Sequence, residues 1–248
     1  MMPKDNDLKS LARKQFSRSP AQRGALMTSS DVPRATVDPP SNYGEFWKNH
    51  DGGLEWYTSM YESRLAQHSS FQNWFRFIDA AKPVQSVLEI GCGLAVGYAD
   101  FFKDLRYAGV DVATQLIDWC RANRENSRHQ YIADDFIADP PREKFDLVFS
   151  QGTIDNTYDM DAFLGAMVAA TRRWIYVTAY RGFFPELTEH RLTWCKEQGV
   201  YYNDISPHQA YRTLEKSGCR NIMVFPAFTG QDNISHETVI IGSAPHDA

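Results

Sequence analysis

The chain has 248 residues, 43% of them hydrophobic and 13% aromatic, a composition that fits one globular domain with appendages. Its formal net charge is −5, and since residues 1–40 carry +3, the remaining chain carries −8. An acidic body without a run of Lys and Arg among aromatic residues predicts that nucleic acid is not a partner.

The sequence also argues against a membrane or secreted location. No apolar run approaches the roughly 20 residues that span a bilayer, and the first residues lack the apolar segment of a secretory signal. The cysteines show no C-x-x-C spacing, so neither a disulfide framework nor a metal site is predicted. We therefore expect a cytoplasmic protein with reduced thiols and no membrane or metal partner.

Residues 1–41 are predicted to form a disordered basic tail. The segment is rich in Ser, Pro, Arg and Lys and poor in aromatic residues, so burial cannot offset the entropy of ordering it. A transit peptide is the alternative, and Asp5 and Asp7 argue against it because such peptides are poor in acidic residues.

Residues 42–82 are predicted to form a helical cap of two amphipathic helices. Large apolar residues recur there at spacings of three and four. They are Leu54, Tyr57, Tyr61 and Leu65 in the first helix and Phe71, Trp74, Phe75 and Ile78 in the second. Such a stripe more often packs in a core than lines a ligand site, whereas Arg64 and His68 share a face that can look towards a pocket.

Residues 83–244 are predicted to form an α/β core. Seven short apolar runs, most of them bounded by Gly, Asp, Pro or Ser, predict strands. They span residues 85–90, 106–111, 129–134, 145–150, 174–180, 220–226 and 237–243. Segments of helix length, including 114–123 and 161–173, predict a doubly wound seven-stranded sheet with helices on both faces. Only a short loop joins the last two runs, so the last strand is predicted to be antiparallel.

The glycine-rich stretch VLEIGCGLAVG follows the first predicted strand, where open α/β sheets bind ligands. Gly91 and Gly93 would let the backbone approach a ligand closely, because neither carries a Cβ atom. Asp111 follows Glu89 by 22 residues and ends the second strand, where a carboxylate can accept both hydroxyls of a ribose. Glu89 would repel a pyrophosphate by about 1 to 4 kcal/mol and favours a cationic ligand.

Together these motifs resemble those of the class I S-adenosylmethionine-dependent methyltransferases. The resemblance covers about residues 85–243 and rests on EIGCG, GVD, ADDF, FDLVFSQG and the antiparallel last strand, which a plain dinucleotide-binding domain lacks. It implies a Rossmann-like fold with S-adenosylmethionine as the cofactor. The implied contacts are Glu89, Gly91 and Gly93 with the methionine part, Asp111 beside Val112 with the ribose, Asp134 or Asp135 with the adenine amino group, Phe136 with the adenine ring, and Ser150 and Gln151 with the methyl group. Arg64 of the cap is added to the cofactor-binding set.

Several of these residues have a structural alternative. Asp111 can instead cap a helix that starts near Ala113. One member of the Asp134 and Asp135 pair can be merely solvated, and Asp135 is the favoured ligand. Cys92 is predicted to be a small residue packed between glycines rather than a catalytic thiol.

The acceptor side is predicted from the segments after the fourth and fifth strands. Asp155 and Asn156 follow the fourth strand and are catalytic candidates. An insertion at about residues 181–205 is predicted to be a substrate lid. The substrate pocket is predicted to be lined by Tyr57, Tyr61, Tyr180, Tyr201 and Tyr202.

His190 in this insertion has two interpretations. As a catalytic residue it would be a general base for a hydroxyl acceptor, because imidazole titrates near neutral pH. The alternative is an exposed helical histidine. A helix is predicted after it, with Ser206 as the N-cap, Pro207 in the first turn and Gln209 completing a capping box.

The sequence thus predicts an enzyme that transfers a methyl group from S-adenosylmethionine to an oxygen, or less readily a nitrogen, of a small metabolite such as a sugar or natural-product intermediate. One alternative is an NAD-dependent oxidoreductase, which the glycine loop and the ribose carboxylate also permit. Another is a protein that binds S-adenosylmethionine without catalysis, since no compelling base stands out. The expected partner is a small-molecule substrate, and a homodimer is left open.

Overall fold

The computed structural model describes residues 38–48, 54–55, 57, 59, 77–78, 80–96, 98–227 and 237–244. Most of the predicted tail and much of the predicted cap lie outside these residues, including Tyr61, Arg64 and His68. Within the described part of the chain, no helix is both long and apolar enough to cross a membrane.

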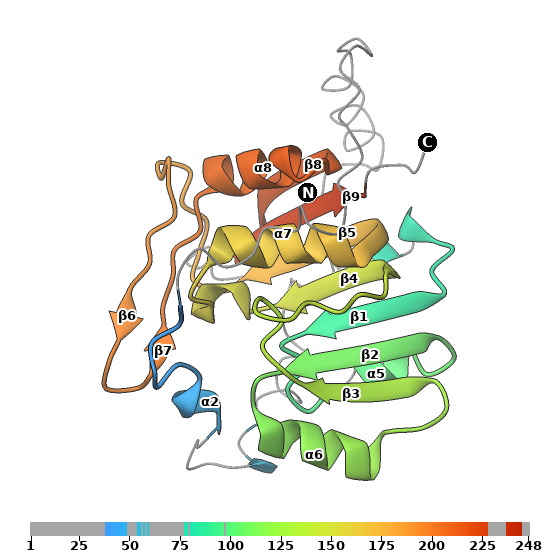
Figure 1. The fold of residues 1–248 in the computed structure, drawn as a ribbon. Coiled ribbons are helices and arrows are strands. Elements are labelled where there is room, and N and C mark those ends of the chain that lie inside the picture. The colour runs from blue at the N-terminus through green and yellow to red at the C-terminus, as the bar shows by residue number, and fades with distance from the viewer. Residues whose placement is uncertain are drawn as a thin grey trace, which may run out of the picture. The chain divides into compact units, whose positions relative to one another are not determined.

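A seven-stranded sheet organises the described chain (Figure 1). Its strands are β1 (Ser86–Ile90), β2 (Arg106–Asp111), β3 (His129–Ala133), β4 (Phe145–Gln151), β5 (Thr171–Ala179), β8 (Arg220–Ala227) and β9 (Glu237–Ser243). The order is β3-β2-β1-β4-β5-β9-β8, in which β1 to β5 pair in parallel and β9 runs antiparallel to β5 and β8. The predicted doubly wound sheet with an antiparallel last strand is confirmed. At the edge, the pairing of β8 with β9 shifts register between Arg220 and Met223.

Helices and a small hairpin complete the described elements. They are α2 (Glu45–Lys48), α5 (Tyr98–Phe101), α6 (Thr114–Asn123), the 3-10 helix η1 (Ile154–Asn156), α7 (Met160–Ala170), α8 (Pro207–Lys216), and the hairpin strands β6 (Trp194–Cys195) and β7 (Val200–Tyr201). The helix predicted over 161–173 ends earlier, because Thr171 already belongs to β5. The Thr171 hydroxyl donates to the Trp174 carbonyl at 2.9 Å, a local bond that competes with helix formation.

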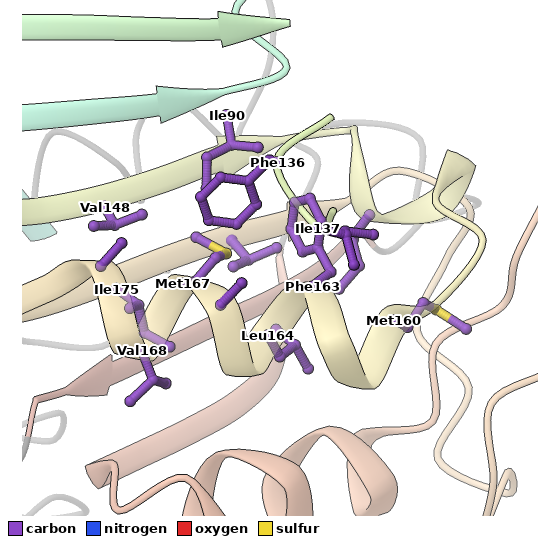
Figure 2. Close-up of a cluster of buried hydrophobic side chains, with 14 of the residues drawn as sticks. Ile90, Phe136, Ile137, Val148, Met160, Phe163, Leu164, Met167, Val168 and Ile175 are labelled. Carbon is purple, nitrogen blue, oxygen red and sulfur yellow. The ribbon is translucent and has the colours of Figure 1, made fainter. Parts of the chain in front are cut away.

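Hydrophobic clusters cover both faces of the sheet, as parallel strands require. Alternate residues of β1 point to opposite faces, so Leu88 belongs to the cluster with α7 and α8 and Val87 to the cluster with α5 and α6. Figure 2 shows part of the first cluster, with Phe163 and Met167 of α7 pointing toward Phe136 and Ile90.

We expect Phe163→Ala to lower the free energy of unfolding by about 3 to 5 kcal/mol, because Phe163 is 2% exposed and its loss leaves a cavity. Phe101→Ala, at a position 46% exposed, is the matched control and should cost about 1 kcal/mol or less. Urea unfolding of both variants checks the difference, and equal losses would contradict the assigned core.

Candidate functional site

The loop after β1 contains two left-handed glycines. Gly91 has φ +71° and Gly93 has φ +53°. A Cβ atom on Gly91 would lie 1.9 Å from Oγ1 of Thr153, whose hydroxyl donates to the Ile90 carbonyl at 3.3 Å. The sequence suggested that Gly91 makes room for a ligand, but in the structure Thr153 fills that room. No local pattern singles out Thr153, because its role depends on the neighbouring strand.

Asp111 holds the glycine loop against the start of α6. Its Oδ2 accepts from the Gly93 amide and its Oδ1 from the Ala113 amide, both at 2.9 Å. Burial raises the pKa of Asp111, and the amides of Ala113, Gly93 and Val112 oppose this shift. Asp111 therefore does bind the start of α6, as the capping alternative predicted. Each carboxylate oxygen still has a second lone pair for a ligand hydroxyl.

Glu89 is a buried acid rather than an open one. It is 4% exposed and accepts a hydrogen bond from the Tyr107 hydroxyl. Burial raises the pKa of Glu89 from 4.5 to about 8, and the Tyr107 hydrogen bond opposes that shift. The predicted repulsion of a pyrophosphate assumed an ionised Glu89, so the structure corrects that argument for neutral pH. A cation bound nearby would lower this pKa again and favour the carboxylate.

Two adjacent acids follow β3 in different surroundings. Asp134 is exposed and lines a cavity of about 240 Å³. Asp135 is half-buried, and its carboxylate accepts from the Ile137 amide at 3.0 Å and from the Tyr158 hydroxyl at 3.1 Å. Asp135 is therefore a loop anchor as well as a ligand candidate, and Asp134 is the more open of the two.

Two of the side chains predicted to contact the cofactor interact with other parts of the protein. Phe136 packs in the core with α7, where its ring meets Phe163 edge-on at 5.8 Å between centroids (Figure 2). Ser150 is fully buried, and its hydroxyl donates to the Ile90 carbonyl at 2.9 Å, which ties β4 to β1. Both side chains thus have structural roles, and their contacts with the adenine ring and the methyl group stay predictions.

Gln151, the last residue of β4, retains an unused polar group. Its Nε2 is buried and has no hydrogen-bond partner among the described residues. The register places Gln151 beside Thr178 of β5, at the same edge as the glycine loop. Leaving a buried donor unpaired costs about 1 to 3 kcal/mol, so an acceptor group on a ligand would stabilise it.

Asp155 and Asn156 belong to η1 and contact the end of β5 and the hairpin. Asp155 is 1% exposed, and its oxygens accept from the amides of Tyr180 at 3.1 Å and Arg181 at 3.0 Å. Burial raises the pKa of Asp155 to about 7, against the effect of these amides. Asn156 donates to the Tyr201 carbonyl at 2.6 Å and to the Tyr180 hydroxyl at 3.2 Å. The structure thus brings these four predicted residues together.

An aromatic group adjoins this cluster. Tyr43 meets Tyr158 edge-on at 4.9 Å and lies 6.3 Å from Tyr201, measured between ring centroids. Sequence reasoning missed Tyr43, because it precedes the apolar periodicity of the cap and only the fold brings it to the site.

The other two described tyrosines predicted to line the pocket have hydroxyl groups with partners of their own. Tyr57 is buried, its hydroxyl donates to the Trp47 carbonyl at 3.3 Å, and burial followed by the charge of Asp111 raises its pKa. The Tyr202 hydroxyl donates to Gln198 at 2.6 Å within the hairpin. Tyr57 therefore lies on the Asp111 side, and Tyr202 belongs to the hairpin.

Neither interpretation of His190 matches the structure. Its side chain is 3% exposed, Nδ1 accepts from the Ser206 amide at 2.9 Å, and Nε2 lies 3.6 Å from Asp161. Gln209 does not complete the capping box, because it accepts from the His190 amide and donates to Asp161, both at 2.6 Å. Ser206 does cap α8, accepting from the Gln209 amide at 3.1 Å. His190 is a buried structural residue with neither nitrogen placed as a base.

Comparisons with known proteins agree with this architecture. The profile of a family described as a methyltransferase domain matches residues 88–173. A search of curated proteins finds no match to the chain.

Solved structures share the fold at low sequence identity. Phosphoethanolamine N-methyltransferase 2 of Haemonchus contortus, with phosphomonomethylethanolamine and S-adenosylhomocysteine, is 16% identical at a TM-score of 0.60, over 82% of this chain and 60% of its own. The 1,6-didemethyltoxoflavin-N1-methyltransferase of Burkholderia thailandensis, with that compound and S-adenosylhomocysteine bound, is 13% identical at 0.58, over 86% and 94%. The N-terminal domain of EvdMO1, in the presence of SAH and D-fucose, is 17% identical at 0.53, over 70% and 82%. The chain has the class I S-adenosylmethionine-dependent methyltransferase fold and spans 60% of the Haemonchus enzyme.

We expect Gly91→Ala to destabilise the protein more than Gly152→Ala. Both positions have a positive φ, +71° and +66°, so both variants incur about 1 to 2 kcal/mol of backbone strain. A Cβ at Gly152 meets Tyr180 at an ordinary 3.4 Å, whereas one at Gly91 overlaps Thr153, which adds about 1 to 3 kcal/mol. Chemical unfolding measures the difference, and equal losses would show that Thr153 does not constrain the loop.

Glu89 should give the protein a measurable dependence of stability on pH. Because its pKa is raised from 4.5 to about 8 in the folded state, its contribution is present at low pH and lost as the pH rises through about 8. Glu89→Gln should remove this loss, so wild type should weaken relative to the variant between about pH 5 and 9. Unfolding at several pH values tests this, with the exposed Glu143→Gln as control. Parallel pH curves for wild type and Glu89→Gln would contradict the assignment.

Proposed function

We propose that the chain is an S-adenosylmethionine-dependent methyltransferase acting on a small molecule. The observation that carries this proposal is the glycine loop of β1, held by both oxygens of Asp111 at the carboxyl edge of a sheet with a reversed last strand. Open α/β sheets bind their ligands at that edge. The methyltransferase-domain match over residues 88–173 supports the same function.

The nucleoside part of the cofactor fits the ends of β2 and β3. The spare lone pairs of Asp111 would accept the ribose hydroxyls, beside Val112. Asp134 or Asp135 would accept from the adenine amino group, with Asp134 the more accessible carboxylate. Tyr57 would close this side, since it is buried near enough to Asp111 for that charge to affect its pKa.

The methionine part fits the ends of β1 and β4. S-adenosylmethionine supplies a methyl group activated on a sulfonium. The unpaired Nε2 of Gln151 would donate to a ligand acceptor there, which removes the cost of its burial. Gly91 and Gly93 form the backbone wall, and the carboxyl of Glu89 would ionise in response to the positive charge. Arg64 remains a predicted member of this set outside the described residues.

On the acceptor side, the chain mainly has to align the acceptor atom and exclude water, and a strong base is optional. Asn156 and Tyr180 offer neutral hydrogen-bonding groups, and Tyr43 and Tyr201 offer ring surface. Such groups suit a hydroxyl-bearing metabolite, so we retain oxygen as the preferred acceptor and a sugar or natural-product intermediate as the substrate class. Residues 181–205 would act as the lid.

Nitrogen is the second choice of acceptor atom. Two of the similar structures are named N-methyltransferases, and the third was described with D-fucose.

Asp155 orders the chain after β5 through two backbone amides, so we assign it a positioning role. A cytoplasmic location and a homodimer stay predictions from the sequence.

We expect S-adenosylhomocysteine, and not NAD, to raise the melting temperature of the full chain. A ligand at about 100 times its dissociation constant adds roughly 2.7 kcal/mol to the free energy of unfolding. Parallel thermal melts with each compound measure this. A shift with NAD alone would overturn the proposal and restore the oxidoreductase alternative.

Labelled methyl transfer across a metabolite panel then separates an enzyme from a protein that only binds the cofactor. Incorporation into a hydroxyl compound would support the proposed acceptor, and incorporation into an amine would replace it. Cofactor binding without incorporation into any compound would favour the binding-protein alternative.

A further inference from the structure

Two arginines of the insertion share one buried carboxylate. The Asp204 side chain is 7% exposed. Its Oδ1 lies 3.3 Å from both Nε and Nη2 of Arg181, and its Oδ2 lies 2.8 Å from Nε and 2.7 Å from Nη2 of Arg191. The backbones of Arg191 and Asp204 also exchange hydrogen bonds of 3.0 and 2.9 Å. Two guanidinium groups against one carboxylate leave one positive charge, in a chain whose net charge is −5.

Backbone contacts bring this arginine pair to the acceptor side. The Arg181 amide donates to the Asp155 carboxylate at 3.0 Å, directly after the end of β5. The amide of Asn203, which precedes Asp204, donates to the Asp155 carbonyl at 2.8 Å. Asp155 therefore holds the backbone next to both arginines: its side chain binds the amide of Arg181, and its carbonyl binds the residue before Asp204.

Both guanidinium groups are held and remain accessible. Cζ of Arg181 lies 5.9 Å from the ring centroid of Tyr202, and Cζ of Arg191 lies 5.9 Å from that of Phe184. The two arginine side chains are 39% and 56% exposed. Among the described residues, Nη1 of neither arginine has a hydrogen bond or ion pair. An arginine with one edge held and the other open presents a preformed fork for an oxyanion.

The acids nearest in sequence do not neutralise the pair. Glu186 and Glu189 lie between the two arginines in the chain and are exposed. Neither forms an ion pair with Arg181 or Arg191 in the part of the chain that the structure describes. The open edges are thus free for a group that is not part of this protein.

We infer that Arg181 and Arg191 form a subsite for an anionic group, a carboxylate or a phosphate, carried by the methyl acceptor. The inference rests on the proposed function, because it assigns a substrate class to that same site. Asp204 fixes the two side chains before the ligand arrives, which lowers the entropy lost on binding. The residual positive charge would also attract an anionic acceptor to an otherwise acidic chain.

The test is an equilibrium titration of the full chain at low ionic strength with inorganic phosphate and, separately, acetate, each with and without S-adenosylhomocysteine. We expect wild type to bind at least one anion, and Arg181→Gln and Arg191→Gln each to weaken its affinity by about tenfold or more. Stronger binding of phosphate or of acetate identifies the anion class. Arg181→Lys keeps the charge without the fork and should lose part of the affinity.

Arg106→Gln is the matched control. Arg106 is also paired with a carboxylate, that of Glu143, and its Cζ lies 4.9 Å from the ring centroid of Phe145. It is the first residue of β2, however, so it lies at the amino-terminal ends of the parallel strands, away from the proposed site. Its loss should leave the anion affinity within about twofold of wild type. Unchanged melting temperatures show that the variants are folded, and if one glutamine variant unfolds, the other and Arg181→Lys carry the test.

The outcomes separate the two proposals. If S-adenosylhomocysteine binds and neither anion does, the subsite is overturned and the proposed function stands. If Arg106→Gln weakens the anion as much as the other variants do, the binding is non-specific and the subsite is again overturned. If anions bind as expected but S-adenosylhomocysteine does not, the arginine site stands and the proposed function fails.

Discussion

The two hydrogen bonds that the Asp111 carboxylate accepts determine the shape of the ligand-binding edge. They join the loop after β1, the end of β2 and the start of α6 through the amides of Gly93 and Ala113. Ala113 stands at the N-cap of α6 and has no side chain that can cap the helix, so Asp111 supplies the acceptor from outside. One carboxylate thus maintains both the loop and the helix that a nucleotide-like ligand would meet.

Asp155 plays the corresponding part on the other side, where it orders the end of β5 and, through Asn203, the hairpin. Asp155 is buried and Asp111 is half-buried, and burial raises the pKa of each. Together with Glu89, they line this edge with acids whose pKa values are raised by burial. Such a site avoids strong mutual repulsion while it is empty of cations and gains negative charge when a positive ligand enters.

Most of the fold was predictable, because apolar runs bounded by turn residues mark buried parallel strands and the short loop before β9 excludes a crossover helix. The site was less so. The position of Asp111 at the end of β2 could be predicted because it follows from the order of the strands. The surroundings of Phe136, Ser150 and His190 could not be predicted, because they depend on distant partners, Phe163, Ile90 and Asp161. Tyr43 and Thr153 carried no local signal, since only tertiary packing brings Tyr43 to the acceptor side and Thr153 to the glycine loop.

The edge strand β8 has a consequence for self-association. An open edge invites a second copy to extend the sheet, and natural proteins blunt such edges with bulges and proline. The register shift after Arg220 coincides with Asn221 in a left-handed conformation, φ +50°, and Pro226 removes one amide donor further along. Strand-to-strand assembly across β8 is therefore disfavoured, and of the two edge strands of the described sheet only β3 lacks such a register shift and proline.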